Sequence, residues 1–321
     1  VQCLINKRLP PMKLAFFDSY RLGLIVDDSI VDISSLISGF PYANPNDAMI
    51  HLIEKFDEYK DALEKAQRLG QRINLSGVRL RAPLPKPGNI VCMAVNYMED
   101  GTLAEPPLIN AFHKASSCVI GPGDTLVLPD IPAIVFEAEA ELAIIIGRRA
   151  DKVAAADWRD YVFGYSNFMD GSARGMKPEK NSFFQAKSRN TFAPMGPWIV
   201  TADEIADPQN LDIAMNLNGQ PRQRFNTNDM AHSIANSIEW LSHIHPLEPG
   251  DIIATGTNHR GLGAIQDGDV LELSVEGLGT LSVNVKDDLR RTWSNETRLQ
   301  RQTQGLNALS PQLTGKYAAS Q

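Results

Sequence analysis

Three glutamates alternate with alanine in residues 136–147. Alternate side chains of a β-strand point to the same face, so Glu137, Glu139 and Glu141 would share one face. Carboxylates this close repel one another unless a cation or solvent neutralises them. A solvated strand face is the ordinary alternative. However, the apolar run 142–146 follows at once and indicates a buried strand, which favours a bound partner for the carboxylates.

A further acid, Asp170, comes after a second strand-like run that begins at Phe163. Carboxylate oxygens are ligands that suit Mg²⁺, Mn²⁺ or Ca²⁺. Neither histidine nor cysteine stands next to these acids in the sequence, which counts against zinc. The residues therefore indicate a site for a divalent cation with oxygen ligands.

The elements that must position these acids begin with three β-like runs in residues 13–33, with a tight turn predicted at Asp27 and Asp28. Asn46 is the predicted N-cap of a helix that runs to about Leu69 and stops at Gly70. Three prolines in residues 82–88 predict a stiff linker, and we place a domain boundary there.

Beyond this linker short strands dominate, and only one helix is predicted, from about Met230 to His243. This pattern is typical of a β-rich α+β fold and not of a doubly wound one. The predicted strands are 90–95, 125–128, 142–146, 198–200, 211–217, 251–254, 270–275 and 280–285. We predict an N-terminal extension (1–11), a small α+β domain (12–82), a β-rich domain (83–293) and a polar tail (294–321), mobile or draped over a partner.

The net charge of −7 disfavours nucleic acid as a partner, because an acidic surface repels phosphates. For the same reason the charge does not predict binding to an anionic membrane. No apolar run approaches the roughly 20 residues that span a bilayer. Residues 1–11 lack the apolar region of a signal peptide. The three cysteines, Cys3, Cys92 and Cys118, do not form a disulfide or zinc pattern. Together these features predict a cytoplasmic protein.

Several segments together resemble the fumarylacetoacetate hydrolase superfamily over roughly residues 84–290. Residues 139–147 resemble the Glu-x-Glu-Leu-Ala metal strand of that family, and residues 164–174 resemble its Gly-Tyr…Asp-x-Ser-Ala-Arg segment. The other matching segments follow in the expected order at 186–197, 218–219, 226–230, 247–257 and 276–279.

The resemblance implies a mixed β-sandwich or roll that pairs as a homodimer. It also implies that Glu139, Glu141 and Asp170 hold one Mg²⁺ or Mn²⁺, with Ca²⁺ as a third option. In this family the cation binds a small 2-oxo or diketo acid and stabilises its enolate.

The resemblance also assigns a catalytic residue, Lys187, and several substrate-binding residues. Lys187 matches the active-site lysine of the family, and Gly256 and Thr257 match a loop that contacts the substrate carboxylate. Glycine in such a loop lets backbone N–H groups approach an anion. The further substrate-binding candidates are Arg174, Tyr165 and Gln185, of which Tyr165 fits the core equally well.

One departure concerns the general base. The family usually carries Asn-Tyr-x-x-His, with a glutamate three residues further on, but here Asp100 stands at the histidine position and Leu103 at the glutamate position. An imidazole is a good base near neutral pH, whereas an ordinary aspartate, with a pKa of about 3.9, is a weak one. The candidate replacements are Asp100, Glu99, His113 and His259. Asn190 stands where the family has aspartate and Asn258 where it usually has proline, so the resemblance defines the substrate less narrowly.

The leading hypothesis is a metal-dependent hydrolase that cleaves a C–C bond in a 2,4-dioxo acid, such as an acylpyruvate or fumarylpyruvate. The alternatives on the same fold are a 2-oxo-acid isomerase, tautomerase or decarboxylase, which the missing histidine favours, and a catalytically impaired relative that keeps its metal. A purely structural role leaves the carboxylates unexplained.

Overall fold

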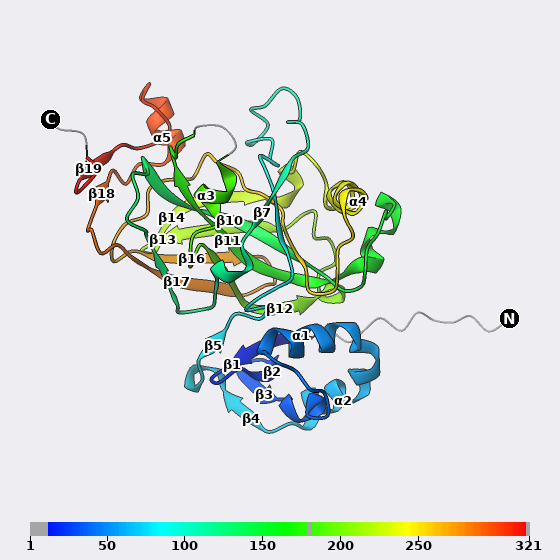
Figure 1. Ribbon diagram of the computed structural model, residues 1–321. Coiled ribbons are helices and arrows are strands. Elements are labelled where there is room, and N and C mark those ends of the chain that lie inside the picture. The colour runs from blue at the N-terminus through cyan, green and yellow to red at the C-terminus, as the bar shows by residue number, and fades with distance from the viewer. Residues whose placement is uncertain (1–11, 179–181, 319–321) are drawn as a thin grey trace.

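The computed structural model describes residues 12–178 and 182–318, so the predicted extension 1–11 lies outside the described residues (Figure 1). The β-rich α+β fold is confirmed, with most strands in one twelve-stranded and one five-stranded sheet. Among the described residues, no helix is long and apolar enough to cross a membrane.

The N-terminal unit, drawn in blue below the other elements in Figure 1, carries two helices beside a short antiparallel sheet. The predicted strands and the turn at Asp27 and Asp28 are confirmed. The elements are β1 (Lys13–Phe17), β2 (Arg21–Val26), β3 (Ser29–Asp32), α1 (Pro45–Glu54), α2 (Phe56–Leu69), β4 (Arg72–Asn74) and β5 (Leu80–Arg81).

The single helix predicted from Asn46 to Leu69 is wrong in two respects. Asn44 is the N-cap, because its side chain accepts the Asp47 N–H while Pro45 takes the first helical position. Asn46 lies inside α1, where its buried side chain accepts the Lys86 N–H. The chain also leaves the helical conformation at Lys55, so two helices form; Gly70 ends the second as predicted.

The large sheet continues from the N-terminal unit into the rest of the chain, because β1 pairs with β12 and aligns Lys13 with Val200. Its path is β4-β3-β2-β1-β12-β11-β10-β15-β6-β7, with β5 and β8 paired beside it. The division at residues 82–88 therefore remains a proposal. The remaining strands of this sheet are β6 (Ile90–Met93), β7 (Ala111–Lys114), β8 (Val119–Ile120), β10 (Val135–Ile146), β11 (Val162–Arg174), β12 (Ala193–Thr201) and β15 (Ile252–Ala254).

A five-stranded sheet of order β14-β13-β16-β17-β9 lies against β10 and β11. One hydrophobic cluster joins the two sheets, with Ile144 and Met169 on one side and Leu273 and Val283 on the other. The strands are β9 (Thr125–Val127), β13 (Asp212–Leu217), β14 (Gln220–Asn226), β16 (Val270–Val275) and β17 (Thr280–Lys286). The predicted helix near Met230 is α4 (Ile234–Ile244), and the short helix α3 (Phe183–Lys187) precedes β12.

The tail predicted to be mobile or draped over a partner is instead packed on the protein in its described part. It contains α5 (Arg298–Thr303) and β19 (Gln312–Thr314), which pairs with β18 (Thr292–Trp293). The N–H of Arg298 donates to Leu262 O at 2.7 Å. Polar composition misled the prediction, because hydrogen bonds hold this segment more than apolar burial does.

Candidate metal centre and active site

Strands β10 and β11 bring the predicted ligands together. They are adjacent and antiparallel, and their register places Glu139 directly opposite Asp170. Glu141 lies two residues further along the same face of β10. One ligand oxygen from each of the three acids lies within 4.8 Å of the others, and all three side chains are buried. All three acids lie inside the long buried strands, whereas the predicted strand 142–146 began only after Glu141.

Two buried lysines contact this triad. Lys187 Nζ donates to Glu139 Oε2 at 2.8 Å and to Asp170 Oδ2 at 2.6 Å. Lys114 Nζ donates to the other Asp170 oxygen at 2.5 Å and also bonds the Lys187 carbonyl. Sequence reasoning missed Lys114, since it sits at the end of a short strand 56 residues from Asp170 and only the fold joins them.

The third glutamate on this face, Glu137, has a different set of partners. It accepts from Arg174 Nε at 2.8 Å and from Arg298 Nε at 2.9 Å. Arg174 also bonds Glu139, so this candidate substrate residue bridges two of the acids. Glu137 is therefore neutralised by arginines rather than placed among the candidate metal ligands.

The pKa values of Glu139 and Glu141 are shifted in opposite directions. Burial by itself would raise the pKa of Glu139, but Lys187 and Arg174 outweigh it and hold that pKa well below its ordinary value. Burial together with repulsion from Asp170 and Glu139 raises the pKa of Glu141 well above its ordinary value. Among the described residues, Glu139 and Asp170 form ion pairs with lysine or arginine while Glu141 forms none, so a divalent cation would supply the charge that this carboxylate lacks.

The predicted substrate loop does reach this site. Gly256 donates its N–H to Glu141 Oε2 at 2.7 Å. Its φ of +87° favours glycine, and an added Cβ would lie 3.0 Å from the Asn96 Cβ. Thr257 is buried, and its hydroxyl donates to Ala140 O at 2.8 Å, so that proton is already committed to the protein. Gln223, which the sequence did not single out, donates to the same hydroxyl.

A histidine–glutamate pair stands beside the triad. His259 Nδ1 lies 2.6 Å from Glu99 Oε1. The backbone N–H of His259 donates to the other carboxylate oxygen of Glu99. His259 Nε2 lies 4.0 Å from Glu139 Oε1. Asp100 does not take part: its half-exposed side chain accepts from Asn258 and lies 3.6 Å from Arg260 Nε. Among the base candidates, the structure therefore brings His259 and Glu99 to the metal centre and leaves Asp100 outside.

Three other sequence candidates lie elsewhere. Tyr165 is a core residue, and burial raises the pKa of its hydroxyl. The Gln185 side chain donates to the Lys177 carbonyl. His113 is exposed and stacks on His245, with ring centroids 5.5 Å apart. The sequence motifs could not show that these three side chains point away from the triad, because neighbouring residues in a motif can point in opposite directions.

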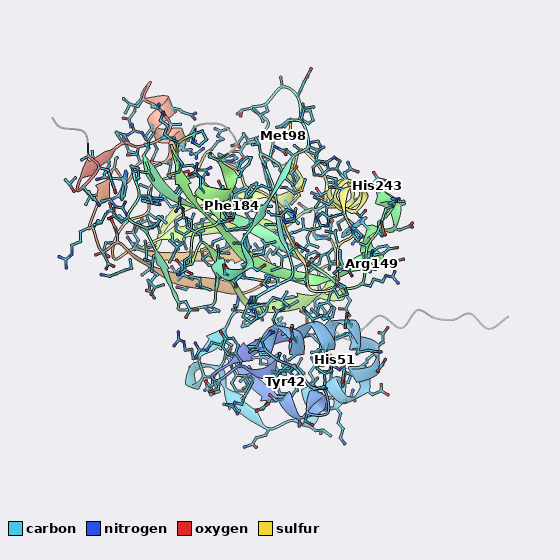
Figure 2. All side chains as sticks on the ribbon, in the orientation of Figure 1. Tyr42, His51, Met98, Arg149, Phe184 and His243 are labelled. Atoms are coloured by element: carbon cyan, nitrogen blue, oxygen red, sulfur yellow. The ribbon has the colours of Figure 1, made fainter. Side chains whose placement is uncertain are left out.

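Beside Glu139 lies a small recess of about 50 Å³, whose lining also includes Arg174, Lys187, Thr257 and His259. Phe112 and Phe183 form an apolar part of its wall, with rings stacked 4.6 Å apart. In Figure 2, Met98, which precedes Glu99, and Phe184, which follows Phe183, both lie away from the N-terminal unit that carries Tyr42 and His51.

Fold and site together define a metal-centred enzyme of mixed β architecture. Residues 89–286 match the family described as fumarylacetoacetate (FAA) hydrolase C-terminal, and the chain belongs to this family.

Individual relatives cover most of both chains. The chain is 32% identical to a maleylpyruvate hydrolase of Aquipseudomonas alcaligenes, over 86% of this chain and 99% of the relative. It is also 32% identical to an oxaloacetate tautomerase of Bacillus subtilis, over 84% of this chain and 99% of the relative. A crystal structure of maleylpyruvate hydrolase from Sphingobium sp. SYK-6, in complex with manganese(II) ion and pyruvate, superposes with a TM-score of 0.78 at 39% identity, covering 86% of this chain and 99% of that one.

Proposed function

We propose that this protein is a divalent-metal-dependent hydrolase that cleaves a C–C bond in a 2,4-dioxo acid such as an acylpyruvate or fumarylpyruvate. The observation that carries the proposal is the His259–Glu99 pair beside the carboxylate triad. It supplies the general base that the sequence lacks at Asp100. The relation to maleylpyruvate hydrolases supports the same substrate class.

Glu139, Glu141 and Asp170 would hold the cation, Mg²⁺ or Mn²⁺ in preference to Ca²⁺. Their all-oxygen donor set fits these ions, and burial together with the neighbouring carboxylates raises the pKa of Glu141, which supports a cation at this position. When bound, such an ion supplies Lewis-acid stabilisation of the enolate charge. Asp170 and Glu139 raise the pKa of Lys187 against the effect of burial, so Lys187 stays protonated and can donate to a substrate oxygen in the recess.

His259 is the proposed base. In the tautomer in which Nδ1 donates to Glu99, Nε2 is the ring nitrogen that can accept a proton from water. The hydroxide oxygen adds to the acyl carbon, the C–C bond breaks, and its electron pair forms the enolate of the 2-oxo acid. His259 then returns the proton to the enolate carbon, while Glu99 stabilises the transient imidazolium.

The test is turnover of acetylpyruvate and oxaloacetate by metal-free protein, with and without added Mg²⁺ or Mn²⁺, followed by NMR. We expect acetate and pyruvate from acetylpyruvate only when metal is present. Pyruvate from oxaloacetate alone, or no turnover of either compound, would contradict the hydrolase and favour a decarboxylase or an impaired metal-binding relative.

A tautomerase or isomerase is the second candidate, because the same His259 can move a proton between carbon and oxygen without activating water. The relation to an oxaloacetate tautomerase supports it. It predicts metal-dependent loss of the enol absorbance of oxaloacetate with no release of a second product.

The oligomeric state and the cell compartment remain proposals. A homodimer is expected from the family resemblance, and a monomer mass in light scattering would refute it. The acidic composition and sparse cysteines support a cytoplasmic location.

A further inference from the structure

A larger cavity opens beyond the recess. Its volume is about 460 Å³, and it shares Val95 and His259 with the recess. Small-molecule sites in proteins typically measure roughly 300–1,000 Å³, so this cavity can hold the part of a substrate that extends away from the metal centre. Arg260, Arg298 and Gln302 contribute to its wall.

The C-terminal segment 294–308 forms one side of this cavity, although the family match ends at residue 286. The segment is fixed in place. Leu299 N–H donates to Arg260 O at 3.0 Å, which ties α5 to the loop that carries His259. A capping box between Thr297 and Gln300 begins the helix. These hydrogen bonds hold the segment in a defined position at the cavity wall.

Arg298 is oriented by Glu137. Its Nε and Nη2 both donate to that buried carboxylate, which holds the guanidinium rigidly. Within the described part of the chain, no acceptor bonds Arg298 Nη1. Glu137 also pairs with Arg174, which in turn pairs with Glu139, so Arg298 shares its carboxylate with a second guanidinium.

Arg260 adds a second cation to the same wall. It donates through Nη1 to the Glu99 carbonyl at 3.1 Å, and its nearest carboxylate, Asp100, is 3.6 Å away and half exposed. Glu99 is the one acid among the described residues that line the cavity, and it is paired with His259. Two guanidiniums, those of Arg260 and Arg298, therefore line the cavity together with one carboxylate, that of Glu99, and Arg298 keeps at Nη1 a donor that no acceptor among the described residues bonds.

We propose that Arg298 and Arg260 bind a second carboxylate at the far end of the substrate, so that the site selects dicarboxylic over monocarboxylic 2,4-dioxo acids. This inference rests on the proposed function, since it places the 2-oxo acid end of the substrate in the recess. A terminal carboxylate is the group that guanidinium donors recognise best, in geometry as well as charge.

The test compares two six-carbon 2-oxo acids that differ only at the far end, 2-oxoadipate and 2-oxohexanoate. Calorimetry on the Mn²⁺-loaded protein measures both Kd values without requiring turnover. We expect 2-oxoadipate to bind about 10- to 100-fold more tightly, the usual range for hydrogen bonds to charged groups. Arg298→Gln and Arg260→Gln should each reduce that ratio strongly, and Arg298→Lys should keep part of it.

Arg290→Gln, at an exposed arginine in the same part of the chain, is the matched control and should keep the wild-type ratio. If Arg298→Gln does not fold, Arg260→Gln still decides, because its partners are near the surface. Equal affinity for the two acids in the wild type, or a preference that survives in both variants, would overturn the proposal. Acetylpyruvate has only one carboxylate, so its cleavage at saturating concentration tests the proposed function, whereas the ratio of the two Kd values tests only this inference.

Discussion

Glu141→Gln is expected to weaken binding of Mg²⁺ and Mn²⁺ by more than about 100-fold, beyond what mutation of residues outside the ligand set usually costs. At the same time, the metal-free variant should unfold at a higher denaturant concentration than metal-free wild type. Glu141 is buried and repelled by Asp170 and Glu139, and Lys187 offsets this only in part, so a neutral amide of the same shape removes that repulsion, for a gain on the order of 1 kcal/mol.

Asp170→Asn is the matched contrast. It should lose the metal equally, but it should also destabilise the metal-free protein by about 3–5 kcal/mol, because Lys114 and Lys187 lose a shared buried partner. Calorimetry measures the metal affinity and urea unfolding measures the stability. Retained affinity in either variant would refute the ligand assignment, and equal stability changes would refute the charge balance described above.

The pH dependence of Glu141→Gln gives a further check. The folded state raises the pKa of Glu141, so the folded protein holds that proton more tightly than the unfolded chain. This stabilisation is complete below the ordinary pKa of 4.5 and is lost as the pH rises through the raised value. The stability advantage of the variant in metal-free protein should therefore grow as the pH rises, and a constant difference would contradict the assignment.

His259→Gln is expected to lower kcat for acetylpyruvate cleavage by about 10²- to 10⁴-fold, the usual contribution of a general base, while Mn²⁺ binding persists. Glu99→Gln should lower kcat less, because it removes the orienting carboxylate and leaves the imidazole in place. Steady-state kinetics and calorimetry on the same samples separate the two effects.

Asp100→Asn is the control for this pair. Asp100 is next to Glu99 in the chain, but its side chain turns to Asn258 and Arg260, so its removal should leave acetylpyruvate cleavage nearly unchanged. If Asp100→Asn abolishes turnover and His259→Gln does not, the base is Asp100 and the role of His259 is structural.

The sequence by itself was sufficient for the family and most of the strands, and for the proposal that Glu139, Glu141 and Asp170 hold a metal ion. The alternation of Glu139 and Glu141 within a buried run is a local pattern, and strand geometry alone puts both side chains on one face. The β-branched runs were equally local, so β16 and β17 appear where they were predicted, within a residue. A local pattern fails where two nearby residues of the same type could both cap a helix. Asn44 and Asn46 are such a pair, and the prediction took Asn46 although Asn44 is the N-cap.

Only the tertiary structure decided which groups surround the metal centre. Lys114, Gln223 and Arg298 come from segments far from the triad in sequence, and nothing in their immediate neighbours indicates a buried charge or a hydrogen bond across the fold. For the same reason the sequence could not favour one candidate base over the others. His259 and Glu99 are 160 residues apart, and only the folded loops bring them into hydrogen-bonding contact and turn Asp100 away.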